Sequence, residues 1–176
     1  MKQEKAGFKS QLFFIISMKK SFKPIVNSQT HSLFLGTLPG EVSLAENKYY
    51  AHPQNKFWRL IYDLFEQEYD VNYDNRMAFL IAQNFGLWDV VQRAEREGSL
   101  DSAIKNLQVN DFKLLLEAYP NLKNFYFTSK QAYQWYYKTY KDSLPVSLIV
   151  LASPSPANAR MTYAEKFNNW KVKILK

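Results

Sequence analysis

From residue 31 onward the chain alternates short apolar runs with longer segments of helical periodicity. The apolar runs are rich in β-branched and aromatic residues, as short buried strands are. We predict strands at 31–35 (HSLFL), 87–91 (LWDVV), 124–127 (NFYF) and 146–151 (VSLIVL). The periodic segments predict helices at 55–68, 76–83, 110–118, 129–140 and from Thr162 onward, where Glu165 completes a capping box.

Strands separated by helices indicate a mainly parallel sheet, because parallel neighbours need crossover connections. The predicted fold class is therefore α/β, a three-layer α/β/α sandwich with a central, mainly parallel four-stranded sheet. Ligands of such sheets bind beyond the carboxyl ends of the strands. The loops in which we expect a site are 36–56, 92–109 and 152–161.

Composition narrows the classes of protein that this chain can belong to. Its 176 residues fit one domain, and the absence of Cys excludes a disulfide scaffold, a thiolate zinc site and a Cys nucleophile. Two His residues disfavour a His-rich metal site or a His-dependent triad. We expect no metal and no cofactor. No apolar run approaches the roughly 20 residues that span a membrane.

The N-terminus resembles a short signal peptide, with three Lys residues before the apolar run 12–16. No small-residue cleavage site follows before Met18, which could itself be a start. We therefore interpret residues 1–21 as a dispensable basic tail in front of a single domain at 22–176, and we expect a cytoplasmic protein.

The net charge of +7 is distributed unevenly. Residues 1–23 carry +5, residues 24–122 carry −5 and residues 123–176 carry +7. A basic C-terminal third favours a polyanionic partner, although an ordinary solvated lysine surface would give the same pattern.

The first loop carries the most informative chemistry. It lacks both the GK[ST] of a phosphate-binding loop and the G-x-G-x-x-G of a dinucleotide fold. Two glycines and two prolines constrain its backbone, and Tyr49, Tyr50, Gln54 and Asn55 lie just before a helix. Aromatic faces and amides suit a planar, polar ring. Ordinary core packing would also explain the two tyrosines.

Residues 36–58, GTLPGEVSLAENKYYAHPQNKFW, resemble the first motif of the uracil-DNA glycosylase superfamily. They are most similar to the hypoxanthine-DNA (deoxyinosine) glycosylase branch, which has G-S-x-P-G-x-x-S-L and Y-Y-x-x-P-x-N-x-F-W. LWDVV with residues 96–104, residues 110–112 and SPSPANA at 153–159 also resemble that branch. The resemblance covers roughly residues 22–174.

Two departures qualify this resemblance. Leu38 stands where the mismatch-specific relatives place a catalytic Asn. The deoxyinosine branch also lacks this Asn, and its activity is attributed to the Asn of P-x-N-x-F-W, which is Asn55 here. Thr128 and Ser129 replace the Asn-Gly turn of many members, so no role is carried over to that turn.

The resemblance implies a monofunctional DNA glycosylase of base-excision repair that acts on DNA, and a monomer is the default expectation. It would flip a deaminated base out of the helix and hydrolyse its N-glycosidic bond, with hypoxanthine as the first expectation and uracil or xanthine as further substrates. The alternative is a non-catalytic nucleic-acid-binding module that grips a flipped base. A nucleosidase acting on free nucleosides fits the basic C-terminal third less well.

Asn55 is the implied catalytic residue. Its amide cannot serve as a strong base, so it would orient water through its carbonyl, which we favour, or donate to the departing base. A helix N-cap would equally explain an Asn at this position.

The base-binding residues are expected on the first loop and on the second predicted strand. Tyr50 falls where relatives stack an aromatic ring on the flipped base. Gly36, Leu38 and Gly40 would shape the pocket, with nearby backbone N–H groups reading a base carbonyl. Asp89 is a candidate pocket acid, and an ordinary buried, hydrogen-bonded Asp is an equal alternative.

The last loop is expected to bind DNA. Small hydroxylated residues, exposed amides and a following helix suit phosphate. The alternative is a Pro-rich connector. The residues assigned to DNA binding are Ser153, Ser155, Ala157, Asn158 and Arg160.

Overall fold

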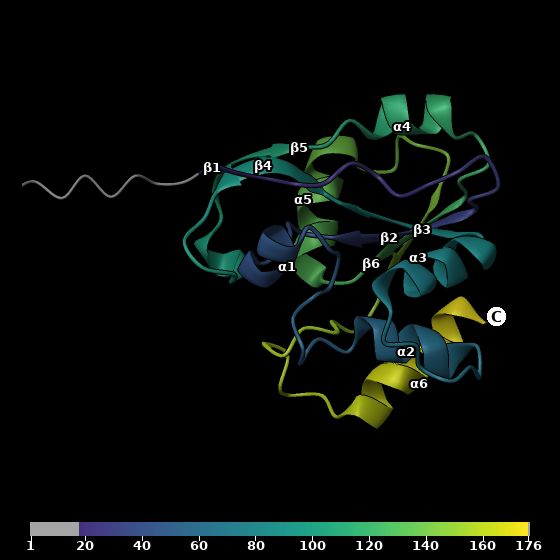
Figure 1. Ribbon diagram of the computed structural model, residues 1–176. Coiled ribbons are helices and arrows are strands. Elements are labelled where there is room, and N and C mark those ends of the chain that lie inside the picture. Colours follow the sequence, from purple (N-terminus) through teal and green to yellow (C-terminus); the bar gives the residue numbers. More distant parts are fainter. Residues whose placement is uncertain (1–17, 176) are drawn as a thin grey trace, which may run out of the picture.

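The computed structural model describes residues 18–175 and contains a central four-stranded sheet (Figure 1). The strand order is β3-β2-β6-β7, and every neighbouring pair is parallel. The strands are β2 (Ser32–Gly36), β3 (Phe85–Asp89), β6 (Asn124–Phe127) and β7 (Ser147–Val150). The four strands expected from the apolar runs are all present, and the predicted α/β/α sandwich is confirmed.

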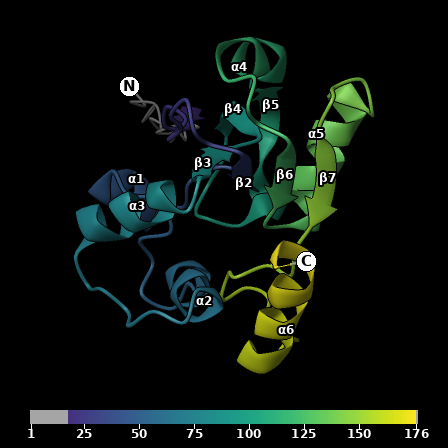
Figure 2. The same ribbon diagram turned by 90° about the vertical axis from the view of Figure 1, so that its right-hand side faces the viewer.

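Helices cover both faces of this sheet. Figures 1 and 2 show α2, α3 and α6 on one side, and α4 and α5 on the other. The helices are α1 (Glu41–Glu46), α2 (Phe57–Leu64), α3 (Tyr73–Ala82), α4 (Phe112–Ala118), α5 (Lys130–Tyr140) and α6 (Tyr163–Ile174). The predicted capping box of Thr162 and Glu165 is confirmed at the start of α6. The loop predicted at 36–56 was wrong in one respect, because it contains the short helix α1.

The alternation of side chains along β2 builds two hydrophobic cores. Phe34 points to one face, where its ring stacks on Trp170 of α6 with centroids 5.5 Å apart. Leu33 and Leu35 point to the other face and pack in the cluster that contains Phe112 and Tyr136. Because successive strand residues face opposite sides, a continuous apolar run is what a strand buried on both faces requires.

A second, antiparallel sheet was not anticipated. Its order is β1-β4-β5, formed by β1 (Met18–Lys20), β4 (Val91–Glu95) and β5 (Lys105–Val109). The bounds predicted for the strand at 87–91 were wrong, since β3 spans Phe85–Asp89 and the chain enters the second sheet after Val90. The loop predicted at 92–109 was also wrong, since it holds most of β4, the 3-10 helix η1 (Asp101–Ala103) and β5. Gln92 and Arg93 are exposed, so β4 lacks the apolar run by which the other strands were found.

Residues 18–21, which the sequence assigned to the tail, pack on the domain. Met18 to Lys20 pair with β4, and the Ser21 N–H donates to the Gln92 carbonyl at 2.8 Å. The rest of the predicted tail, residues 1–17, lies outside the described residues.

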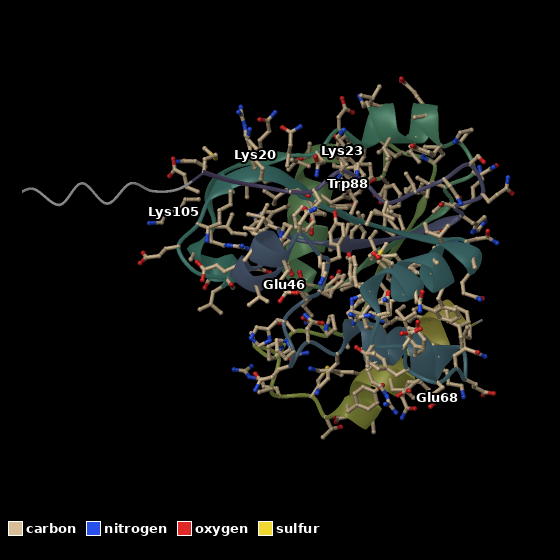
Figure 3. The ribbon with its side chains drawn as sticks, in the orientation of Figure 1. Lys20, Lys23, Glu46, Glu68, Trp88 and Lys105 are labelled. Atoms are coloured by element: carbon tan, nitrogen blue, oxygen red, sulfur yellow. The ribbon has the colours of Figure 1, made fainter. Side chains whose placement is uncertain are left out.

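Most charged side chains lie at the surface, and most large apolar side chains lie in the interior. Figure 3 shows Lys20, Lys105 and Glu68 at the periphery, and these side chains are exposed, whereas Trp88 is only 8% exposed. Among the helices formed by residues 18–175, none combines the length and apolarity needed to cross a bilayer.

Candidate functional site

A cavity of about 700 Å³ lies at the carboxyl ends of β2, β3 and β6. It is lined by the loops that follow β2 and β7 and by the segment that contains η1. Every residue assigned to a site from the sequence borders this cavity: Gly36, Leu38, Gly40, Tyr50, Asn55, Asp89, Ser153, Ser155, Ala157, Asn158 and Arg160. Segments far apart in the sequence are thus brought to one place.

Gly36 and Asp89 lie side by side on the cavity wall. They are register partners at the last positions of the parallel strands β2 and β3. A Cβ on Gly36 would lie 2.7 Å from Asp89 Oδ1 and 3.4 Å from the Tyr50 hydroxyl oxygen. The absence of a side chain at position 36 therefore leaves the room that the Asp89 carboxyl occupies.

Asp89 is a buried carboxyl at the cavity, with only 3% of its surface exposed. Its Oδ2 accepts a 2.8 Å hydrogen bond from the Ser21 hydroxyl. Burial raises the pKa of Asp89 to about 7, and the Asp101 carboxylate acts in the same direction. The hydroxyls of Ser21 and Tyr49 and the charge of Arg96 lower the pKa in part. Asp89 can therefore carry a proton near neutral pH.

Tyr50 contacts both the hydrophobic core and the cavity. Its ring stacks on Phe57 with centroids 3.9 Å apart and an interplanar angle of 8°. Its hydroxyl shares a 3.1 Å hydrogen bond with Thr128 Oγ1, and burial raises the pKa of the Tyr50 phenol. Because Phe57 covers one face of the ring, the opposite face is the one that a ligand can reach. The neighbouring Tyr49 is 3% exposed and packs in the core.

Asn55 lies two residues before α2 and is half-buried at the cavity. Its Oδ1 accepts a 2.9 Å hydrogen bond from the N–H of Phe57, the first residue of α2. The N-cap alternative for Asn55 was wrong, since the N-cap is Lys56. The Phe57 N–H can only donate, so the oxygen of the amide faces the helix. No hydrogen bond to a described residue uses the Asn55 amide nitrogen, and this nitrogen is available to a ligand.

The loop after β7 is held by its own polar groups and by its neighbours. Asn158 Nδ2 donates to the Ser153 carbonyl at 3.2 Å, and the Asn158 N–H donates to the Ser155 carbonyl at 3.1 Å. The buried Lys166 of α6 reaches the same Ser155 carbonyl at 3.4 Å. Arg160 is exposed at the rim of the cavity.

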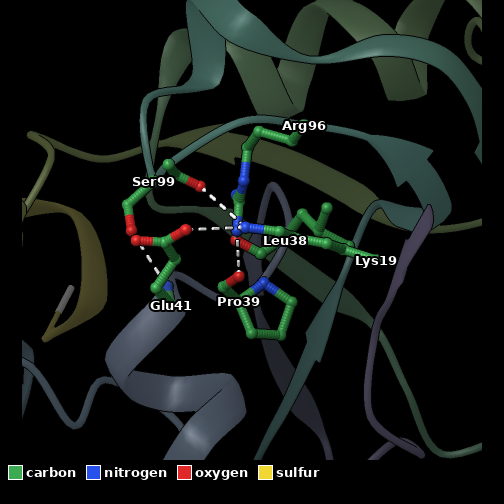
Figure 4. A network of polar contacts seen from close by, with 7 residues as sticks. Lys19, Leu38, Pro39, Glu41, Arg96 and Ser99 are labelled. Carbon is green, nitrogen blue, oxygen red and sulfur yellow. Dashed lines mark hydrogen bonds and ion pairs between the residues drawn. The ribbon is translucent and has the colours of Figure 1, made fainter. Parts of the chain in front are cut away.

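Sequence reasoning missed a buried residue that binds the backbone of the first loop. Arg96 is only 2% exposed, and its guanidinium donates to the Leu38 carbonyl at 3.1 Å and to the Pro39 carbonyl (Figure 4). Burial lowers the pKa of this Arg, while the carboxylates of Asp101, Asp89 and Glu41 raise it in part. Arg96 was noticed only as the first residue of a family-like stretch, and nothing in its local pattern marks it as buried.

A second set of polar contacts lies beside the same loop. Lys19 of β1 forms a 3.0 Å ion pair with Glu41 and donates to the Gly98 carbonyl at 3.2 Å, while the Glu41 N–H donates to Ser99 Oγ at 2.9 Å (Figure 4). These contacts connect β1, the start of α1 and the turn after β4. They hold the rim of the cavity through the half-buried Lys19 and the exposed Glu41.

Thr37 and Asp101 are further cavity residues that sequence reasoning did not single out. Thr37 Oγ1 donates to Asp101 Oδ1 at 2.6 Å, and burial raises the pKa of Asp101. The stretch REGSLDSAI, which includes Asp101, was part of the family resemblance, and that was the available signal. Within residues 18–175, no group of three or more His, Asp or Glu side chains is placed to hold a metal ion.

Comparisons with known proteins point in one direction. The family model of the uracil DNA glycosylase superfamily matches residues 24–176. A hypoxanthine DNA glycosylase of Methanosarcina barkeri is 36% identical over 149 residues, which is 84% of this chain and 93% of the relative. One from Methanosarcina acetivorans is 34% identical over 146 residues, covering 82% and 91%.

A solved structure agrees with this relationship. The chain resembles the solution NMR structure of a candidate uracil DNA glycosylase from Methanosarcina acetivorans, with a TM-score of 0.78 and 32% identity. The match covers 89% of this chain and 96% of that one. Sequence and fold therefore lead to the same family.

Proposed function

The chain belongs to the uracil DNA glycosylase superfamily, and we propose that it is a monofunctional DNA glycosylase that removes deaminated bases from DNA. Hypoxanthine is the base we expect it to prefer, because both Methanosarcina relatives are named hypoxanthine DNA glycosylases and align with more than four fifths of this chain. Uracil and xanthine are further candidate substrates. The products are a free base and an abasic site.

The cavity is the observation that carries this proposal. A volume of about 700 Å³ accommodates a nucleotide, and it lies between an aromatic ring and a loop suited to phosphate. A base in duplex DNA is hidden in the stack, so it must rotate out of the helix to reach such a site. The open face of Tyr50 would then stack on the base, while Gly36, Leu38 and Gly40 shape the pocket around its edge.

Catalysis would depend on positioning and on electrostatic stabilisation. As the bond between C1′ and the base breaks, positive charge develops on the sugar and negative charge on the base. A water held on the other face of the sugar completes the hydrolysis. No Lys lies among the residues that line the cavity, which agrees with hydrolysis by water rather than a Schiff base and with the absence of lyase activity.

Asn55 is the residue to which we assign catalysis. Its Oδ1 already accepts the Phe57 N–H, but an amide oxygen has a second lone pair that can accept from the attacking water. Its Nδ2 can donate to the departing base. The hydrogen bond from the Phe57 N–H holds the amide in one orientation, so this contact and catalysis are compatible in Asn55.

DNA would contact the loop after β7. Exposed backbone and the small side chains of Ser153, Ser155 and Ala157 allow the phosphate backbone to approach closely, and Asn158 and Arg160 add donors. The basic C-terminal third of the chain provides attraction over a longer range. We propose that the protein acts on DNA as a monomer in the cytoplasm.

A strand-scission assay tests the proposal. Duplexes and single strands with one hypoxanthine, uracil or xanthine are incubated with the protein, and half of each sample is then heated in alkali. The account predicts a nick at the lesion only after alkali, together with release of the free base. Tight binding to the lesion without base release would favour the non-catalytic module, and equal cleavage of free deoxyinosine would contradict a repair function.

A further inference from the structure

The two oxygens of the buried Asp89 carboxyl differ in their hydrogen bonds. Oδ2 accepts the Ser21 hydroxyl at 2.8 Å, whereas no described residue forms a hydrogen bond with Oδ1. Oδ1 lies 2.7 Å from the position that a Cβ on Gly36 would take, so it fills the space beside this glycine, and both residues line the cavity. A bound base would meet this oxygen at the wall of the cavity.

The groups around Asp89 are largely uncharged. Ser21 and Tyr49 present hydroxyls to the carboxyl. The Tyr50 phenol lies near it, and its own pKa is raised by burial first and then by the Asp89 charge. The charged neighbours are Asp101 and Arg96, which act in opposite directions. No direct ion pair therefore stabilises the carboxylate form in the described structure, and the protonated form is favoured by burial.

The other titratable groups at the cavity are less suited to proton transfer. Asp101 is only half-buried, although it too has one oxygen bound to a hydroxyl, that of Thr37. Glu41 is paired with Lys19 at the rim. His52 is exposed, and Asn55 does not titrate. Asp89 is the carboxyl that is both buried at the cavity and open at one oxygen.

From this geometry we infer that Asp89 is the general acid of the reaction, donating a proton from Oδ1 to a ring nitrogen of the departing purine. This inference rests on the proposed glycosylase function and adds a catalytic residue to it. Asn55 would then act on the water or on the base edge, while Asp89 neutralises the charge that develops in the leaving ring.

The proton balance of the step is complete. The electron pair of the bond between C1′ and N9 passes to the base, and N7 or N3 of the ring takes the Asp89 proton, so hypoxanthine leaves as a neutral molecule. Water adds to C1′ and releases one proton to the solvent. The Asp89 carboxylate regains one proton from the solvent before the next turnover.

The pH dependence of single-turnover cleavage of a deoxyinosine duplex tests this role. The wild-type rate is expected to be level below about pH 7 and to fall about tenfold per pH unit above it, since only the protonated acid is active. Asp89→Asn retains the shape but has no proton to transfer, and we expect it to be about 100-fold slower at pH 6 and insensitive to pH. Asp74→Asn makes the same change on the exposed surface of α3 and should match the wild type.

Substrate analogues give a second readout that does not depend on the folding of a variant. The bases 7-deazahypoxanthine and 3-deazahypoxanthine each lack one candidate proton acceptor. The wild-type enzyme should cleave one of the two slowly, and Asp89→Asn should cause no further loss on that analogue. If Asp89→Asn slowed both analogues as much as it slowed deoxyinosine, the general-acid role would be wrong.

Two outcomes separate this inference from the proposed function. A wild-type protein that cleaves no lesion overturns both. A wild-type enzyme whose rate increases with pH through 7, or an Asp89→Asn variant within threefold of the wild type at pH 6, overturns only the role of Asp89.

Discussion

The backbone N–H of Lys56 donates a 3.0 Å hydrogen bond to the carbonyl of Pro154. This bond joins the loop before α2 to the loop after β7, although about 100 residues separate them in the sequence. Asn55 is adjacent to the bond, so its position is set relative to the proposed phosphate-binding loop. A shift of one loop would therefore move both Asn55 and the proposed DNA contacts.

Gly36→Ala should inactivate the site while leaving the fold intact. The new methyl group would lie 2.7 Å from Asp89 Oδ1, so the carboxyl must move. Overpacking of this kind costs about 1–3 kcal/mol of unfolding free energy. Gly40→Ala, also at the cavity, should have a smaller effect, since its nearest contact is the flexible Ser99 side chain at 3.3 Å. Thermal unfolding and cleavage rates measure both effects, and full activity of Gly36→Ala would contradict the described geometry.

Arg96→Met should weaken the first loop. The Leu38 and Pro39 carbonyls would lose their buried donor, and we expect a loss of about 2 kcal/mol in unfolding free energy. Cleavage should fall further than stability explains, because the displaced loop shapes the base pocket. Arg93→Met changes an exposed Arg of the adjacent strand and should leave both stability and cleavage unchanged. Denaturant titration and kcat/KM, measured for both variants, check this prediction.

Arg160→Ala should reduce DNA binding without slowing the chemical step. The side chain is exposed at the cavity rim, where it can neutralise one phosphate. Losing that contact should weaken binding to all sequences alike and reduce the slope of log affinity against log salt by about 1. Lys113→Ala, on the exposed face of α4, is the matched control. An unchanged salt slope would place Arg160 outside the DNA interface.

The stability of the protein should depend on pH through Asp89. The pKa of this carboxyl is about 7 in the folded chain and 3.8 in the reference state, so the folded state binds more protons between these values. Its contribution is therefore fully present below about pH 4 and is lost as pH rises to 7, a loss on the order of 4 kcal/mol at most.

Denaturant titration of the wild type and of Asp89→Asn between pH 4 and 7 measures this contribution. The difference in unfolding free energy, wild type minus variant, should decrease as pH rises. A constant difference would mean that Asp89 titrates alike in both states.

The central sheet could be predicted because each strand is buried on both faces. Leu33, Phe34 and Leu35 of β2 form an unbroken apolar run. In so short an element, such a run indicates a strand that is buried on both faces. The membership of the family was also evident from residues 36–58, and the family model confirms it. The cavity followed from the rule that ligands bind at the carboxyl ends of parallel strands.

The second sheet and its polar contacts could not be predicted in the same way. In β4 only Val91 and Ala94 are buried, so the alternation is too short to distinguish a strand from a loop. The burial of Arg96 depends on the Leu38 and Pro39 carbonyls, which are distant in sequence and are brought close only by the fold. The pairing of Thr37 with Asp101 is a tertiary contact of the same kind.

Single-turnover cleavage of a deoxyinosine duplex by Asn55→Ala tests the account most directly. Asn55→Asp is measured beside it, because it keeps the acceptor for the Phe57 N–H but lacks the amide nitrogen. Gln54→Ala, at the exposed neighbouring position, is the control. We predict that Asn55→Ala cleaves at least about 100-fold more slowly while its affinity for the same DNA is retained. Cleavage by Asn55→Ala at the rate of Gln54→Ala would contradict the proposed active site.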